Sequence, residues 1–216
     1  VTTLAATVQL RGNVSDSFPT VPGAIKVDRV DLQAIGMSTS PFVMKGEFDV
    51  DLVNSKPRNL NGNFYATRIQ VADGSNIYVL DSIQVKAKAE NGVQRIDFAS
   101  PFGWANITGD YDYTTMLADA ITLVKKHVRS PDSAAAAART QRKQQADFFA
   151  SLKWPKSLEE LAPDLHMPRP FVMEGRLNTD SSLLVINGKL PFVRYGEFRI
   201  DSMALELKSD VDSLHG

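Results

Sequence analysis

Apolar and polar residues alternate with a period of two along most of this chain. The alternation is clear in residues 4–12, 42–52 and 83–90, where every second residue is apolar and most positions between are polar or charged. This pattern predicts half-buried antiparallel strands, each with one apolar face and one wet face. Because residues 42–52 form a stretch longer than the usual strand of about five or six residues, an extended sheet is favoured over a compact sandwich.

Turn-forming residues separate these stretches. Asp73-Gly74-Ser75-Asn76 and Asn91-Gly92 stand between alternating runs, and Asn and Gly favour tight hairpin turns because both tolerate positive φ. Residues 1–112 are therefore predicted to form consecutive hairpins with about seven or eight strands.

The period changes after Tyr113, and residues 113–168 are predicted to be a helical insertion. In a first helix, one apolar face is expected to contain Met116, Leu117, Ala120, Ile121, Val124 and Val128. A second helix is expected to begin at Ser130 or Ser133 and to run through the alanines to Leu152. Ser-Leu-Glu-Glu at 157–160 is a capping box that predicts a short third helix.

From Arg169 the alternation returns, so residues 169–216 are predicted to continue the same sheet. In its last strand the apolar face shifts at Asp201-Ser202, which predicts a bulge or bend there. The fold class expected is mainly β, with long antiparallel strands in a curved, trough-like sheet. Its concave face would be apolar, and the helices would pack on that face as a lid.

Two short phrases occur twice in the same order. The sequence PFVMKGEFDVD at 41–51 returns as PFVMEGRLNTD at 170–180, and LDSIQVKAKA at 80–89 returns as IDSMALELKS at 200–209. Repetition of this kind favours a stacked, open-ended architecture in which each unit buries its face against its neighbours. Independent convergence of short amphipathic strands is the alternative.

The residues give no catalytic or metal site. The net charge of −1 argues against a nucleic-acid binder, and the absence of cysteine excludes disulfides and thiolate sites. The three histidines lie far apart, without the spacing of metal ligands. The carboxylate pairs Asp49/Asp51 and Asp110/Asp112 are interpreted as the wet face of strands, with a calcium site or an acid–base pair as the alternative. No cofactor is predicted.

What remains is a long sheet with an apolar face. Exposed apolar surface costs about 25 cal/mol per Å² in water, so such a face requires an internal cover or an apolar ligand. The helices can provide the cover, and lipid acyl chains are the natural ligand.

The sequence resembles a known family from residue 40 to residue 209. Residues 81–128 are similar to the repeating segments of the TamB family, which belongs to the AsmA-like, bridge-like lipid-transfer group. The resemblance consists of an Asp-Ser-apolar strand, a Ser-Pro-Phe strand and a Gly-x-Tyr that leads into a helix. These positions are Asp81, Ser82, Ser100, Pro101, Phe102, Gly109 and Tyr111.

The resemblance implies a periplasmic, non-enzymatic protein anchored in the inner membrane outside this stretch, and the chain is accordingly interpreted as a piece of a longer one. It implies a taco-shaped β-sheet that serves outer-membrane biogenesis by conducting or shielding phospholipid acyl chains. It also implies a role in protein translocation and assembly, with an outer-membrane assembly barrel as partner. The long helical stretch departs from the family pattern and predicts a groove that is capped or interrupted here.

The expected groove-lining residues are Phe42, Met44, Phe48, Val50, Ile83, Val85, Ile96, Phe98, Phe171, Met173, Leu177, Met203, Leu205 and Leu207. The expected lid residues are Met116, Leu117, Ile121, Val124, Phe148, Phe149, Leu152 and Trp154. Unpaired sheet edges predict edge-to-edge dimers in crystals. A ligand-free spacer or adhesin-like module is the first alternative function, and a hydrolase using Asp49 or Asp110 is the second.

Overall fold

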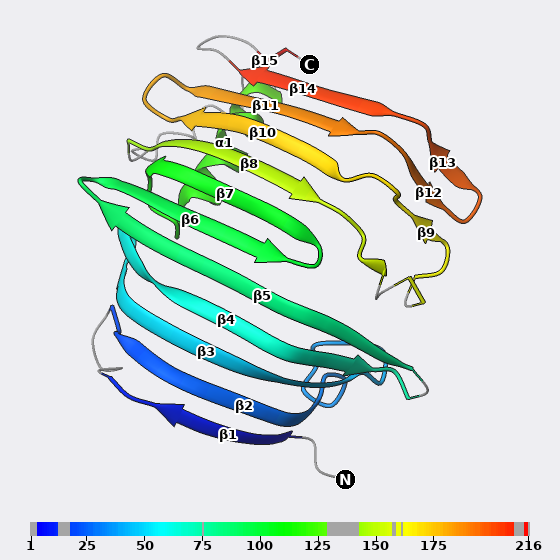
Figure 1. The fold of residues 1–216 in the computed structure, drawn as a ribbon. Helices are drawn as coiled ribbons and strands as arrows, with labels where there is room; N and C mark the ends of the chain where they lie inside the picture. The colour runs from blue at the N-terminus through cyan, green and yellow to red at the C-terminus, as the bar shows by residue number, and fades with distance from the viewer. Residues whose placement is uncertain are drawn as a thin grey trace.

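The fold is a large, curved, open antiparallel sheet with one helix against one of its faces (Figure 1). The computed structural model describes residues 4–12, 18–74, 76–128, 143–156, 159–160, 162–209 and 214–215, and the elements below lie in these ranges. The mainly β prediction is confirmed, and so is its open, curved sheet.

The large sheet has 12 strands, and each pairs in antiparallel fashion with the strand before it. They are β1 (Leu4–Leu10), β2 (Val21–Asp31), β3 (Val43–Lys56), β4 (Asn59–Ala72), β5 (Ile77–Glu90), β6 (Val93–Ser100), β7 (Gly103–Asp110), β8 (Gln145–Leu152), β10 (Phe171–Asn178), β11 (Leu183–Leu190), β14 (Met203–Ser209) and β15 (Leu214–His215). Seven of them fall in residues 1–112, as the alternation predicts.

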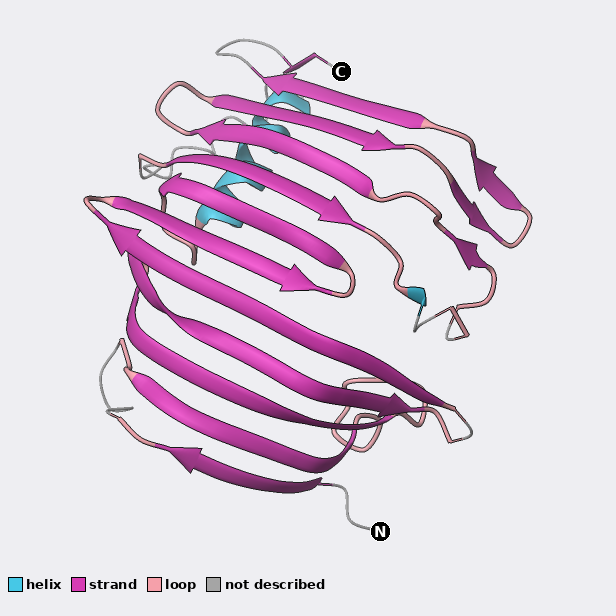
Figure 2. Cartoon of the chain, viewed as in Figure 1, coloured by secondary structure: helices cyan, strands magenta, loops and turns pink. Residues whose placement is uncertain are grey.

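Two smaller parts complete the described chain. A 3-stranded sheet contains β9 (Leu165–His166), β12 (Val193–Tyr195) and β13 (Phe198–Ile200). The helix α1 (Met116–Val128) connects towards β8 and lies behind β8, β10 and β11 in the view of Figure 2.

The predicted helical insertion is wrong at its C-terminal end. Residues 145–152 form β8, which pairs with β7 on one side and β10 on the other. The physical reason is that every second residue, Ala146, Phe148 and Ala150, is apolar, which is the period of a strand. This stretch occupies the position between β7 and β10. Residues 129–142, with most of the predicted second helix, lie outside the described residues, as do positions 157 and 158 of the predicted third; Glu159 and Glu160 lie in a turn.

The predicted irregularity at Asp201-Ser202 is present, because β13 ends at Ile200 and β14 begins at Met203. The matching Asp81-Ser82 lies within the continuous strand β5, where both residues are exposed and the alternation of burial changes phase. In both copies the regular alternation of the strand is therefore interrupted at the same dipeptide.

The repeated glycines of the two copies accommodate aromatic rings. The ring of Phe148 lies across Gly175, where an added Cβ would come within 2.4 Å of the ring and 2.2 Å of the Val185 carbonyl oxygen. At Gly46, an added Cβ would lie 3.3 Å from the ring of Phe48. The glycine of the PFVM-x-G phrase therefore makes room for a phenyl ring on the apolar face.

Candidate functional site: an apolar sheet face

Cross-strand register joins the apolar residues of successive strands into continuous rows. One row, read from β3 to β14, is Val50, Phe64, Val85, Phe98, Ala105, Ala150, Met173, Gly188 and Leu205. The next row is Leu52, Gly62, Ala87, Ile96, Ile107, Phe148, Gly175, Ile186 and Leu207. We call the surface formed by these rows the apolar face. Most of its large side chains are only half-buried.

The structure brings most of the predicted groove residues together on this face. The following residues lie on the apolar face, either in the two rows or in neighbouring rows: Met44, Phe48, Val50, Ile83, Val85, Ile96, Phe98, Phe171, Met173, Met203, Leu205 and Leu207. Phe42 is the first exception, because it lies in the β2–β3 loop, where its carbonyl accepts the Leu32 N–H at 2.8 Å.

Leu177 is the second exception. It lies on the apolar face but is 2 % exposed, because α1 covers it together with Leu184. This end of the face is therefore closed to a ligand at the row that contains Leu177.

The helix α1 contacts the sheet through a different face from the one predicted. Met116, Ala120 and Leu123 pack on the sheet, and Leu123 is fully buried. Leu117 and Ile121 point away, at 68 % and 45 % exposure. Of the three lid residues predicted on this helix whose side chains are described, only Met116 contacts the sheet. The side chain of Val124 lies outside the described residues.

The prediction failed because apolar residues occupy more than one side of α1. Residues 116, 117, 120, 121 and 123 are all apolar, so the sequence is compatible with two overlapping apolar stripes, either of which could face the sheet. The spacing i, i+4, i+7 of Met116, Ala120 and Leu123 is the signal that marks the buried stripe.

A second cover lies over β4 and β5. Trp154 and Phe102, with ring centroids 6.1 Å apart, pack on the buried cluster of Ala66, Ile69 and Leu80. The Lys153 N–H donates to the Phe102 carbonyl at 2.7 Å, which ties the segment after β8 to the β6–β7 turn. Trp154 thus acts as a lid residue, although it does so from a connection and not from a helix.

The other predicted lid residues lie in the sheet itself. Phe148 is part of the apolar face, and Phe149 lies on the opposite, polar face in register with Asn106. Leu152 ends β8 at 36 % exposure. These three residues are strand positions, so their assignment to a helical lid is wrong.

One polar residue interrupts the apolar face, and the sequence pattern did not single it out. Gln94 is 1 % exposed. Its amide nitrogen donates to the carbonyls of Tyr111 at 2.7 Å and Pro57 at 3.3 Å, and its oxygen accepts the Leu60 N–H at 3.2 Å. A buried amide with these partners fastens the β3–β4 turn to the segment that precedes α1.

Further contacts hold the start of α1. The side chain of Asp112, which is 1 % exposed, accepts the Thr114 N–H at 3.0 Å, and the Asp112 N–H donates to the side-chain oxygen of Gln144 at 2.8 Å. Asp112 therefore caps the helix, as aspartates commonly do, and its assignment to a wet strand face is wrong. Asp110 forms an ion pair with Arg58 at 2.5 Å, whereas Asp49 and Asp51 are exposed on the polar face.

Tyr111 offers a test of this region. Its hydroxyl is buried without a hydrogen-bond partner, and burial, with a smaller contribution from Asp97, raises the pKa of this hydroxyl. Because an unpartnered buried hydroxyl costs free energy, Tyr111→Phe is expected to keep or raise the free energy of unfolding, by up to about 1 kcal/mol. Gln94→Ala leaves three backbone groups without their hydrogen-bond partner and is therefore expected to lower the free energy of unfolding by about 2 kcal/mol. Urea denaturation of both variants checks this, and a destabilised Tyr111→Phe would contradict it.

Comparison with known proteins adds no assignment: no family model, no curated protein and no solved structure matches this chain. Among the residues that the structure describes, no helix is long and apolar enough to cross a membrane. Within the same residues, no cluster of three or more His, Asp or Glu side chains could hold a metal ion.

Proposed function

We propose that the apolar face holds phospholipid acyl chains, which it shields or conducts along the sheet, and that the protein is non-catalytic. The observation that carries the proposal is the unbroken cross-strand row from Val50 to Leu205, whose large side chains are half-buried or exposed. Each methylene buried against such a surface is worth about 0.8 kcal/mol, so a chain of many methylenes gains binding free energy without any specific polar contact.

The dimensions of the face suit acyl chains. The row from β3 to β14 crosses nine strands, and eight spacings of about 4.8 Å give a length of about 38 Å along the sheet. The acyl chains of one leaflet are about 15 Å long, half of a hydrocarbon core of about 30 Å. The row is therefore long enough for chains to lie end to end.

The helix α1 narrows this path without closing it. It covers the row of Leu177 and Leu184, but Met203 and Leu205 beside it remain 45 % and 43 % exposed.

Substitution on opposite faces of β14 tests the proposal. Leu205→Glu places a carboxylate on the apolar face, and Ala204→Glu places the same group one residue away on the polar face, where Ala204 is also exposed. Leu205→Glu is expected to reduce co-purified phospholipid, measured by native mass spectrometry, by about tenfold or more, because a carboxylate strongly disfavours apolar contact.

Ala204→Glu is expected to retain the lipid of the unchanged protein. Absence of lipid from the unchanged protein, or equal loss in both variants with unchanged circular dichroism, would count against acyl-chain binding. A ligand-free structural module is the alternative in that case. The covers formed by α1 and Trp154, which bury part of the face internally, favour that alternative.

The cellular setting is proposed from the resemblance to the TamB family alone. On that basis the protein acts in the periplasm in outer-membrane biogenesis, as part of an inner-membrane-anchored chain with an assembly barrel as partner. Among the described strands, the edge strand β1 pairs only with β2. Because its other edge has no strand partner there, edge-to-edge dimers in crystals remain a prediction.

A further inference from the structure

The polar face of the sheet carries an exposed aromatic pair. Trp104 on β7 is 48 % exposed and stacks on Phe149 of β8, with ring centroids 4.5 Å apart and planes 21° apart. In its own cross-strand row Trp104 stands between Ala99 and Ser151. Phe149 covers one face of the indole, and these short neighbours leave about half of the Trp104 side chain exposed, so a flat ligand can reach it.

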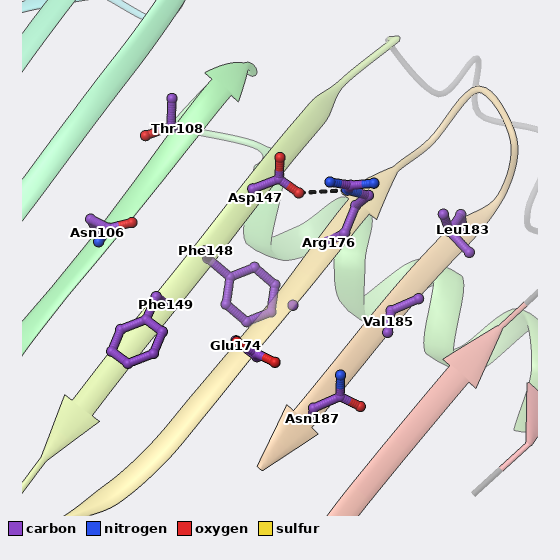
Figure 3. Close-up of a pocket in the computed structure, with 11 residues that line it drawn as sticks. Asn106, Thr108, Asp147, Phe148, Phe149, Glu174, Arg176, Leu183, Val185 and Asn187 are labelled. Atoms are coloured by element: carbon purple, nitrogen blue, oxygen red, sulfur yellow. Dashed lines mark hydrogen bonds and ion pairs between the residues drawn. The ribbon is translucent and has the colours of Figure 1, made fainter.

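A hollow of about 490 Å³ lies beside this pair, on β7, β8, β10 and β11 (Figure 3). Its wall combines the ring of Phe149 with the apolar Val185 and with the side-chain amides of Asn106 and Asn187. Pockets of about 300–1,000 Å³ with a few convergent polar groups are typical of small-molecule sites.

Two arginines near this hollow are paired with carboxylates. Arg176 binds Asp147 across the strands at 2.6 Å, and on the neighbouring β6 Arg95 binds Asp97 at 2.8 Å. With both guanidinium groups engaged by carboxylates, an anionic ligand finds no matching cation in these pairs. The amides of Asn106 and Asn187 and the carboxylate of Glu174 instead suit a neutral ligand with many hydroxyl groups.

We propose that this surface binds a neutral oligosaccharide. One sugar ring lies with its C–H face on the indole of Trp104, since an aromatic ring offers a broad apolar face that needs no charge. The next units lie over the hollow, where the two asparagines and Glu174 hydrogen-bond the hydroxyl groups. Tyr65, in the same cross-strand row, stands three strand spacings from Trp104, or about 14 Å, and extends the platform for a longer chain.

Titration with cellohexaose, chitohexaose and maltohexaose tests this site, with isothermal calorimetry and tryptophan fluorescence as readouts. The chain contains two tryptophans. At least one of the three hexasaccharides is expected to change the fluorescence emission of the exposed Trp104. Trp104→Ala is expected to weaken binding by about tenfold or more, and Asn187→Ala to weaken it less. Tyr195→Ala removes a ring that is 60 % exposed elsewhere and is the matched control, with binding unchanged.

The proposal is overturned if none of the three sugars binds at its solubility limit, or if Trp104→Ala binds as the unchanged protein does. It is also overturned if the face proves to be a self-association surface, seen as a dimer that Trp104→Ala converts to a monomer. Sugar binding does not depend on the lipid proposal, because the two surfaces are opposite faces of the sheet. Leu205→Glu should leave sugar binding intact, and Trp104→Ala should leave bound lipid intact.

Discussion

Gly175→Ala is expected to lower the free energy of unfolding by about 3 kcal/mol, the upper end of the cost of overpacking. An added methyl at Gly175 meets the Val185 carbonyl oxygen at 2.2 Å and the Phe148 ring at 2.4 Å. The ring can turn, but the carbonyl belongs to the neighbouring strand β11 and cannot move without disturbing the pairing of β10 with β11. Urea denaturation followed by circular dichroism measures the change.

The repeat supplies the control for this variant. Gly46 occupies the same place in the first PFVM-x-G phrase, but the atoms nearest to an added methyl there are the Phe48 ring at 3.3 Å and the Ile69 backbone at 3.6 Å. Gly46→Ala is therefore expected to change the free energy of unfolding by about 1 kcal/mol or less. Equal losses in the two variants would show that the phenyl ring, and not the carbonyl of β11, decides the cost.

Leu123→Ala is the second substitution with a large expected effect. Leu123 is fully buried between α1 and the sheet, where it packs against Leu177 and Leu184. Truncation of a buried leucine costs about 3–5 kcal/mol, because apolar contact is lost and a cavity remains. The same denaturation experiment measures the loss, and Leu117→Ala is its matched control.

Leu117 lies on the same helix at 68 % exposure, so its truncation is expected to change the free energy of unfolding by about 0.5 kcal/mol or less. If Leu117→Ala proved the more destabilising of the two, α1 would contact the sheet through the opposite side. The predicted lid of Leu117 and Ile121 would then be correct after all.

Strand positions in this protein follow from local alternation, and most of them could be predicted from the sequence. The pairing order is simple because each strand of the large sheet binds its predecessor, and this order also places residues such as Val85 and Phe98 opposite each other. The strand β8 was missed because adjacent Phe148 and Phe149 follow a run of alanines. Only the tertiary pairing with β7 and β10 shows that these two rings point to opposite faces.

The covers of the apolar face were harder to predict than the face itself. Gln94 sits at an apolar-face position in the alternation, and its partners, Tyr111 and Pro57, come from turns distant in the chain. Trp154 and Phe102 meet because two connections lie at the same end of the strands. Contacts of this kind depend on loop paths, which residue periodicity does not encode.

The most direct test of acyl-chain binding locates the chain by methyl NMR, with a phosphatidylcholine that carries a nitroxide on its acyl chain. Acyl-chain binding to the apolar face predicts strong broadening of methyl resonances there, at Val85, Ile107 and Ile186. It also predicts little broadening on the polar face, at Val172 and Val185. Broadening confined to the polar face, or none on either face, would contradict the proposal that the apolar face holds acyl chains.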